Sequence, residues 1–539
     1  MLFLDYSSTS NTLLLLFASL LLVHLVYRYS RRLQASTTPL NGPPNPSWLF
    51  GASRLIARSS DPGGLYEQWQ DQYGPVYTVP ATFGKPCVVL SDPKAIQHFY
   101  ARETEGYQHT PLLRALAETL IGRGLFWAEG DTHRRHRKAL APAFSLAALK
   151  DMLPIFHDTA HKVQAAWDNI ILAQSPSSDS AIVDVHSWMN RVSFDTFGVT
   201  GFGRDFGTLR GEHNTVMSAI DAFSGMKADF AGCSQFILGL VFPLVLRFPT
   251  AFRRISDQFD AGMSDVVNEI LAEAREEKQI VCNSRDRSIM GLLLKAEKSS
   301  SELRMSSEEI LAQMKLLMVT GYITTSNCLM WCLVELCKKP EIQDKLRLEV
   351  SRLPSGDAAW EQLIDGLPYL DAVLHETLRL HPPLGDTTRV AVENDIIPLF
   401  HPVKTATGAS VDRIFISKGQ LVTVPIQAIN TSPRFWGPDA KEFQPERFLT
   451  EGGIPKQIPG HKHLLTFVSG PRLCLGRHYA LAEAKAVLCL LVRSYAFEFA
   501  DGPDTQTGIN GWLLSRPIIP GGDGQSVPLR VRRLDSTYV

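Results

Sequence analysis

Cys474 lies in a short segment that constrains the fold of this chain more strongly than any other. The segment reads Phe467-Val468-Ser469-Gly470-Pro471-Arg472-Leu473-Cys474-Leu475-Gly476 and runs into a stretch with helical periodicity. A helix N-terminus and nearby backbone N–H groups stabilise negative charge, so this position favours a thiolate that binds a metal. Arg472 offers a cation to an anionic group on the same ligand. A buried structural cysteine is the competing interpretation.

The same ten residues resemble the haem-binding loop of the cytochrome P-450 family, the haem-thiolate monooxygenases, with the pattern Phe-x-x-Gly-x-Arg-x-Cys-x-Gly. Every fixed position is filled, by Phe467, Gly470, Arg472, Cys474 and Gly476. Ala480 and Glu483 continue the match into the next helix. The resemblance implies heme b as the cofactor and the Cys474 thiolate as the proximal ligand of its iron. Electron donation from such a thiolate favours cleavage of the O–O bond.

The domain organisation follows from length, composition and this resemblance. A chain of 539 residues could hold several average domains, but its composition shows no clean internal break. The resemblance implies one catalytic domain, residues 49–539, with a mainly α-helical cytochrome P-450 fold and a small β-sheet region. Residues 33–48 are predicted to be a stiff hinge, because four prolines lie within Pro39–Pro46.

Residues 1–32 are predicted to be a membrane anchor. From Tyr6 to Tyr27 the chain has no Asp, Glu, Lys or Arg, and this apolar run is long enough to cross a bilayer. The basic cluster that follows, with Arg28 first, should stay cytoplasmic and keep the catalytic domain in the cytosol. The resemblance implies the endoplasmic reticulum as the membrane. A cleavable signal peptide is the alternative interpretation.

Charge and cysteine usage exclude other classes of protein. The formal net charge is -1, from 54 basic and 55 acidic side chains, so no strong field favours nucleic acid as a partner. The eight cysteines include no Cys-x-x-Cys pair, which favours a reduced compartment over a secreted disulfide scaffold.

Periodicity predicts where strands and helices lie. Two short β-rich runs between Tyr73 and Leu90 predict a small sheet, and Ser91-Asp92-Pro93 predicts the start of a helix. From about Leu112 to Val350 helical periodicity dominates. The longest helix should begin at the capping box Ser306-Ser307-Glu308-Glu309 and end at Lys338-Lys339-Pro340. Its ~32 residues would span roughly 48 Å, enough to cross a large domain.

Inside this helix, Thr320-Gly321-Tyr322-Ile323-Thr324-Thr325 stands where the family usually has Ala-Gly-x-acid-Thr-Thr. Gly321 and Thr324 match, and the resemblance implies that they admit dioxygen and water and relay protons. Ile323 replaces the usual acid. Three interpretations remain: Thr324 and water suffice, another side chain supplies the acid, or the reaction differs from plain hydroxylation.

Glu376 and Arg379 are three residues apart in a predicted helix, so they share one face and can pair. Their order and spacing relative to Arg447, in Pro445-Glu446-Arg447-Phe448, match the Glu-x-x-Arg helix and meander of the family. The resemblance therefore implies a buried network of Glu376, Arg379 and Arg447 that supports the haem pocket and takes no part in the chemistry.

The two propionates of haem need cations. The resemblance implies Arg472, Arg389 and the pair His133 and Arg137, where His133 stands in place of the family's Trp. Neighbouring basic residues form a predicted docking patch for an acidic electron donor: Arg134, Arg135, Lys138, Lys462 and Arg477. A solvated helix face is the competing interpretation.

Segments that face the substrate are predicted from family position alone: Thr110–Gly124, Phe223–Phe248, Leu316–Thr324, Leu384–Thr388 and Ile509–Leu514. They supply Phe223, Met226, Phe230, Phe236, Phe242, Leu316, Leu317, Leu384 and Leu513. An apolar pocket suits terpenoid, fatty or aromatic substrates. Membership of the plain core is the competing interpretation for each side chain.

Taken together, the resemblance implies a membrane-bound haem-dependent monooxygenase. It would hydroxylate a lipophilic small molecule, terpenoid-like or another secondary metabolite. Dioxygen and electrons from NADPH, passed through a flavoprotein reductase, would drive the reaction. A haem-thiolate isomerase or peroxygenase that needs no reductase is the alternative, which Ile323 keeps open, and a non-catalytic haem-binding membrane protein is another.

Overall fold

The computed structural model describes residues 37–174, 179–218, 251–280, 288–299, 302–354, 356–510, 514–521 and 526–534. The predicted anchor, residues 1–32, lies outside the described residues, as does the start of the predicted hinge. The predicted substrate-facing segment Phe223–Phe248 and Leu513 also lie outside them.

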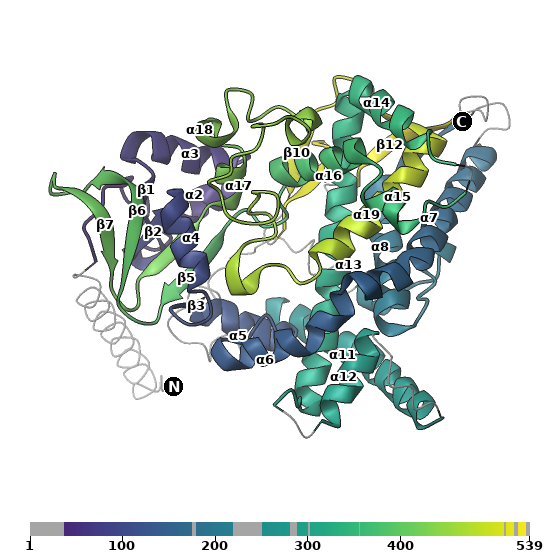
Figure 1. Cartoon of the computed structure of the whole chain (residues 1–539), viewed down its shortest axis with the longest axis horizontal. Helices are drawn as coiled ribbons and strands as arrows, with labels where there is room; N and C mark the ends of the chain where they lie inside the picture. The colour runs from purple at the N-terminus through teal and green to yellow at the C-terminus, as the bar shows by residue number, and fades with distance from the viewer. Residues whose placement is uncertain are drawn as a thin grey trace, which may run out of the picture.

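The protein is mainly helical, with the strands of its largest sheet gathered on one side and most helices on the other (Figure 1). The helices of the N-terminal half are α2 (Ser53–Arg58), α3 (Pro62–Tyr73), α4 (Pro93–Ala101), α5 (Pro111–Leu120), α6 (Gly130–Leu140), α7 (Leu146–Gln174), α8 (Val185–Phe202) and α11 (Ala251–Ile280). Those of the C-terminal half are α12 (Ile289–Glu297), α13 (Ser307–Lys338), α14 (Pro340–Val350), α15 (Trp360–Ile364), α16 (Pro368–Leu380), α17 (Ile426–Asn430), α18 (Pro433–Trp436) and α19 (Arg477–Ser494).

The predicted small sheet has five strands in the order β1-β2-β8-β5-β3. Its strands are β1 (Val76–Pro80), β2 (Pro86–Leu90), β3 (Tyr107–His109), β5 (Thr387–Ala391) and β8 (Leu421–Val424). β2 and β8 run parallel and the other pairs are antiparallel. The β3–β5 register places His109 opposite Arg389, so strands distant in the sequence bring two polar side chains to one sheet edge.

Smaller strand groups complete the fold. A three-stranded sheet has the order β4-β12-β9, formed by β4 (Ser180–Asp184), β12 (Pro528–Arg533) and β9 (Tyr495–Phe499). Two hairpins pair β6 (Asp395–Lys404) with β7 (Ser410–Ile416) and β10 (Gly508–Asn510) with β11 (Arg516–Ile518). The prediction of a mainly helical fold with a small β region is confirmed.

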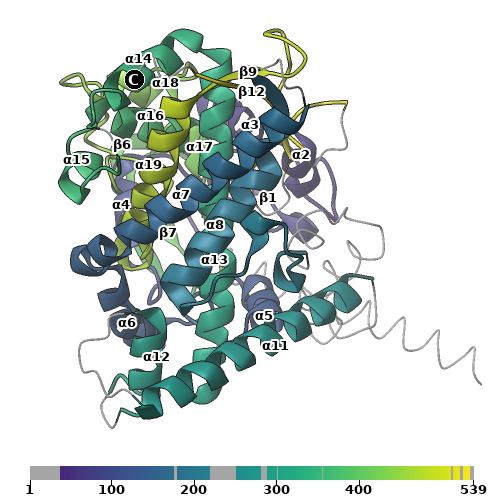
Figure 2. The ribbon, with the colours of Figure 1, turned by 90° about the vertical axis from the view of Figure 1, so that its right-hand side faces the viewer.

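The long helix α13 has the predicted bounds and the predicted capping box. Ser306 Oγ accepts the Glu309 N–H at 3.2 Å, and Glu309 Oε2 accepts the Ser306 N–H at 2.9 Å. Within the described residues, α13 is the single unbroken helix long and apolar enough to cross a membrane, and most of it is buried inside the protein. Figure 2 shows α7, α8 and α13 side by side, with α11 crossing near one end of α13. α13 is therefore a core helix.

Gly321 lies where α13 packs against α8. A Cβ atom at this position would stand 2.4 Å from the ring of Phe197, which is 2% exposed. The Phe197 ring is itself held edge-on against Phe202 and Tyr479. The close approach of two helices therefore requires a glycine here. The sequence interpretation, which assigned Gly321 to the oxygen side of the helix, did not anticipate this contact.

We expect Gly321→Ala to lower the free energy of unfolding by about 1–3 kcal/mol, because the added methyl group overlaps a ring that has no room to move. The matched control is Gly262→Ala in α11, where a Cβ would meet nothing within 4 Å. There the helix propensity of alanine should raise the free energy of unfolding by up to about 1 kcal/mol. Denaturant unfolding of both variants checks this, and equal effects would contradict it.

Candidate functional site

The Cys474 loop is folded back on itself by backbone hydrogen bonds. The Cys474 N–H donates to the Phe467 carbonyl at 2.9 Å, and a turn of 3-10 helix, η6 (Gly470–Arg472), lies between them. Gly470 has φ +67°, and a Cβ there would stand 2.1 Å from the Tyr100 carbonyl, so only glycine fits. Cys474 is the one cysteine of the described residues that is only partly buried.

The surroundings of the Cys474 thiol carry positive charge. Burial raises its pKa above the usual value, and the Gly476 N–H and the guanidinium groups of Arg137 and Arg477 offset part of this rise. Both arginines also brace the loop: Arg137 Nη2 donates to the Leu473 carbonyl at 2.6 Å, and Arg477 Nη1 donates to the Cys474 carbonyl at 3.2 Å. These donors suit a thiolate whose remaining charge is balanced by a metal cation.

The middle of α13 has one face that is open although the helix as a whole is buried. Thr320 is exposed and Thr324 is half-buried, one turn apart, whereas Tyr322 and Thr325 are buried. Thr324 Oγ1 donates to the Thr320 carbonyl at 3.0 Å, so this hydroxyl can still accept a hydrogen bond from water. Ile323 packs against the apolar core. Gly321, three residues before Thr324, is also half-buried and lies beside this face at the contact with α8.

Glu376, Arg379 and Arg447 meet in one buried network. Arg379 donates to both Glu376 oxygens, at 2.7 and 2.8 Å, and Arg447 Nε donates to Glu376 Oε1 at 3.2 Å. Arg379 and Arg447 also donate to carbonyls of Asn430 and Trp436. The side chains of Glu376 and Arg379 are 0% exposed. This network joins α16 to the loops that follow α17.

Arg472 and Arg389 each pair with a buried carboxylate. Arg472 Nη2 donates to Glu129 Oε2 at 2.6 Å, and Arg389 Nη2 lies 2.8 Å from Glu103 Oε1. Within the described residues, the Nε–H group of each arginine has no acceptor. Two free buried donors fit a ligand that brings two carboxylates. The sequence pattern carried no signal for Glu103 or Glu129, because a lone glutamate near a helix end is common.

His133 and Arg137 lie one turn apart on α6, as predicted. His133 is 3% exposed. Burial first, then Arg472 and Arg137, lower its pKa to about 3, so its imidazole is neutral at pH 7. Arg137 faces the Cys474 loop through its bond to Leu473. With Arg472 and Arg389, these residues could hold a metal porphyrin with two acidic side groups.

Part of the predicted basic patch is neutralised. Arg134 pairs with Asp131 at 2.8 Å, and Arg135 Nη2 pairs with Glu309. Lys138 and Lys462 are exposed. Arg135 is turned toward the start of α13 and is not free to meet a partner. The Arg135–Glu309 pair joins segments that are distant in the sequence, and helical periodicity does not reveal such a pair.

The predicted substrate-facing side chains divide into two groups. Leu316 and Leu317 are buried in the core, whereas Leu384 is 39% exposed. Sequence reasoning passed over Asp386, which is exposed between Leu384 and Thr388 and accepts a hydrogen bond of 3.4 Å from Thr388 Oγ1. Asp386 is the one acidic residue of the predicted segment Leu384–Thr388, and this was the signal for it.

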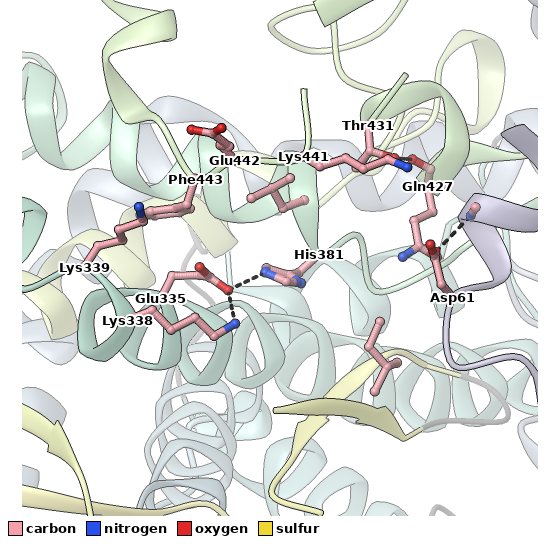
Figure 3. A pocket seen from close by; sticks show the side chains of 13 residues that line it. Asp61, Glu335, Lys338, Lys339, His381, Gln427, Thr431, Lys441, Glu442 and Phe443 are labelled. Carbon is pink, nitrogen blue, oxygen red and sulfur yellow. Dashed lines mark hydrogen bonds and ion pairs between the residues drawn. The ribbon is translucent and has the colours of Figure 1, made fainter. Parts of the chain in front are cut away.

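A separate cavity of about 440 Å³ opens elsewhere, beside the end of α13 (Figure 3). At its wall, Glu335 Oε1 accepts from His381 at 3.0 Å and from Lys338 at 2.8 Å. Burial raises the pKa of Glu335, but these two partners bring it to about 2. His381 stacks flat on Trp331, with ring centres 3.7 Å apart. No residue of the Cys474 loop lines this cavity, so it is distinct from the candidate site.

Comparison with known proteins gives one consistent answer. A family model described as cytochrome P450 matches residues 41–521. The chain is 48% identical to cytochrome P450 monooxygenase claP of Ampulloclitocybe clavipes over 535 residues, and this alignment covers 98% of each chain. It is 46% identical to cytochrome P450 monooxygenase claQ of the same fungus, over 96% of each chain. It is 31% identical to ganoderic acid synthetase CYP5150L8 of Ganoderma lucidum, over 88% of this chain and 90% of that protein.

We expect Glu376→Gln to lower the free energy of unfolding by about 3–5 kcal/mol, because two buried guanidinium groups would lose their only shared anion. Glu442→Gln is the matched control, since Glu442 meets Arg379 through its backbone carbonyl and its carboxylate is exposed. That control should change the free energy by less than about 0.5 kcal/mol. Chemical unfolding measures both, and a Glu376→Gln protein as stable as the control would contradict the network's role.

Proposed function

The chain belongs to the cytochrome P450 family of haem-thiolate monooxygenases, and on this premise we propose that it hydroxylates a lipophilic small molecule. Dioxygen supplies the oxygen atom, and NADPH supplies the electrons through a flavoprotein reductase. The observation that carries the proposal is the partly buried Cys474 in a loop braced by Arg137 and Arg477.

The residues of this chain have distinct roles in the proposal. Bound haem supplies an iron centre that activates dioxygen for insertion into a C–H bond. Cys474 holds the iron through its thiolate. Arg472 and Arg389 hold the two acidic side groups of haem, since each keeps a free Nε–H donor, and His133 and Arg137 add a second pair of donors. Phe467 and Gly476 shape the loop at its two ends.

Thr324 and water deliver protons in the proposal. The hydroxyl stands on the open face of α13, beside exposed Thr320, and can accept a hydrogen bond from water while it donates to its own helix. Ile323 packs into the core and can carry no proton. Of the three interpretations left open by the sequence, this supports the one in which Thr324 and water suffice.

The substrate in the proposal is terpenoid-like or another lipophilic secondary metabolite. The exposed side chain of Leu384 supports it. The printed name of the Ganoderma lucidum relative, ganoderic acid synthetase, supports a natural product as the substrate class. The anchor predicted for residues 1–32 supports the cytosolic face of the endoplasmic reticulum membrane as the location.

A haem-thiolate isomerase or peroxygenase remains the second candidate, favoured by the missing acid at Ile323. Turnover that requires NADPH and the reductase would separate hydroxylation from it. A non-catalytic haem protein is a weaker candidate, because the open face around Thr324 has no purpose without an oxygen site. A monooxygenase should take up oxygen when a lipophilic substrate is added, whereas a non-catalytic haem protein should not.

We expect Cys474→Ser to abolish the thiolate-type band in the reduced carbon-monoxide difference spectrum, because a serine hydroxyl is too weakly acidic to bind iron as an anion. Product formation should fall to the background level. Cys489→Ser, at a buried cysteine remote from the loop, is the control and should keep the band. A Cys474→Ser protein with the parental Soret spectrum would disprove the assignment.

We expect Thr324→Val to lower the product formed per NADPH by about 10²-fold, the usual size of a lost proton-transfer group. NADPH oxidation should continue and release peroxide. Thr325→Val is the matched control, because the Thr325 hydroxyl is 2% exposed and has no partner among the described residues. Equal coupling of NADPH to product in both variants would show that the protons take another route.

A further inference from the structure

Arg472 of the Cys474 loop and Arg389 of β5 are already neutralised by protein carboxylates. Arg472 pairs with Glu129 at 2.6 Å and Arg389 with Glu103 at 2.8 Å, and none of the four side chains is more than 8% exposed. These two cations and two anions sum to zero charge, and Arg137, which donates to a backbone carbonyl, adds one positive charge. The two carboxylates of haem would bring two negative charges into this buried site, more than Arg137 balances, and uncompensated buried charge is costly.

Glu129 is held as an anion on both of its oxygens. Oε2 accepts from Arg472, whereas Oε1 accepts from the His109 N–H at 2.9 Å and lies 3.1 Å from His109 Nδ1. Burial raises the pKa of Glu129, but the contacts with His109 and Arg472 outweigh it and lower the pKa overall. Glu129 is therefore ionised at pH 7.

The ionised form of Glu103 is stabilised far less than that of Glu129. Glu103 lies just after α4 with a side chain that is 0% exposed, and Arg389 is its ion-pair partner. Within the described residues, Glu103 Oε2 has no hydrogen-bond partner. Burial raises the pKa of Glu103, and Arg389 and Arg472 oppose this only in part. Among the described residues, the ion pair of Glu103 and Arg389 thus holds one carboxylate oxygen, Oε2, and one donor, the Arg389 Nε–H, that have no hydrogen-bond partner.

The charged and titratable groups around Glu103 offer no further cation. They are Arg389 of β5, Arg472 of η6, Glu129 before α6 and Tyr100 of α4, whose hydroxyl is bonded to Thr387. His109, on the neighbouring strand β3, has a pKa lowered to about 3, mainly by burial, so its ring is neutral. With haem bound, Glu103 and a haem carboxylate would share the Arg389 guanidinium with little water around them. Two carboxylates in this arrangement cannot both stay ionised.

We propose that Glu103 is a cofactor-binding residue that acts as a neutral acid: in the haem-loaded protein it carries a proton and donates a hydrogen bond to a haem carboxylate. The proton is taken from solvent when haem binds, and no covalent bond changes. Glu129 stays ionised and positions Arg472. The proposal depends on haem binding and is independent of the substrate, the reaction and the electron donor proposed above.

The sign of the pH dependence follows from this proton uptake. Haem is held most firmly below the pKa that Glu103 has in the haem-free protein. Affinity then falls as pH rises, by up to about tenfold per pH unit, until the pKa of Glu103 in the loaded protein is reached. Glu103→Gln places a neutral donor of the same shape at every pH, so it removes this dependence and keeps the hydrogen bond.

The test is the rate of haem transfer from the full-length loaded protein to excess apomyoglobin, followed by Soret absorbance from about pH 6 to about pH 9. The parent should release haem faster as pH rises. Glu103→Gln should match the parent within about twofold at the acidic end and show a flat profile. The matched control Glu129→Gln should release haem about tenfold faster, because it loses a charge-assisted bond to Arg472, and should keep the parental slope.

Infrared spectroscopy of the loaded protein is the second measurement. The parent should show a protonated-carboxyl C=O band that shifts in D2O and is missing from Glu103→Gln. Loss of haem from Glu103→Gln at about pH 7, failure of that variant to accumulate with haem, or a parental pH slope in it would overturn the proposal, because each requires an ionised Glu103. A parent without the infrared band would overturn it as well.

Discussion

The buried ion pairs of Glu376 are the constraint on which the rest of the structure depends. One carboxylate with no exposure binds two guanidinium groups, and these in turn collect backbone carbonyls from the segments after α17. Asn430 extends the same network, since its side chain bonds Leu465 and Thr466, and Thr466 Oγ1 bonds the Leu378 carbonyl of α16. The segment that leads into the Cys474 loop is thereby fastened to α16. Since a buried charge tolerates few alternative partners, this arrangement has little freedom to shift.

Buried opposite charges also pair on the other side of the site, around Arg389 and Arg472. Arg389 and Arg472 each have a buried counter-charge, whereas Arg137 and Arg477 donate to backbone carbonyls of the loop. Among the described residues, the buried groups of this cluster without a hydrogen-bond partner include the Nε–H groups of Arg389 and Arg472 and Oε2 of Glu103. A site built this way selects its ligand by matching donors and acceptors as well as by charge. The open face of α13 at Thr320 and Thr324 supplies polar groups on another element, and the helix around them is apolar.

Much of this could be predicted from the sequence because the signals are local. The capping box of α13, the turn that precedes α4 and the helical spacing of Glu376 and Arg379 are set by residues within a few positions of one another. Other features could not be predicted. The close contact of Gly321 with Phe197 of another helix is one of them. Arg135 was expected at a docking surface, but it pairs with Glu309, which comes from a segment distant in the chain.

The sequence by itself therefore determined the family, the thiol that can bind a metal, and the elements that carry it, because a ten-residue loop and helix signals act over short distances. The tertiary structure alone decided which side chains neutralise the buried arginines and which face of α13 stays open. Glu103 and Glu129 reach Arg389 and Arg472 only after sheet pairing and loop packing bring distant segments together. Electrostatic compensation in a buried site depends on distances through space, and a linear pattern of residues does not contain them.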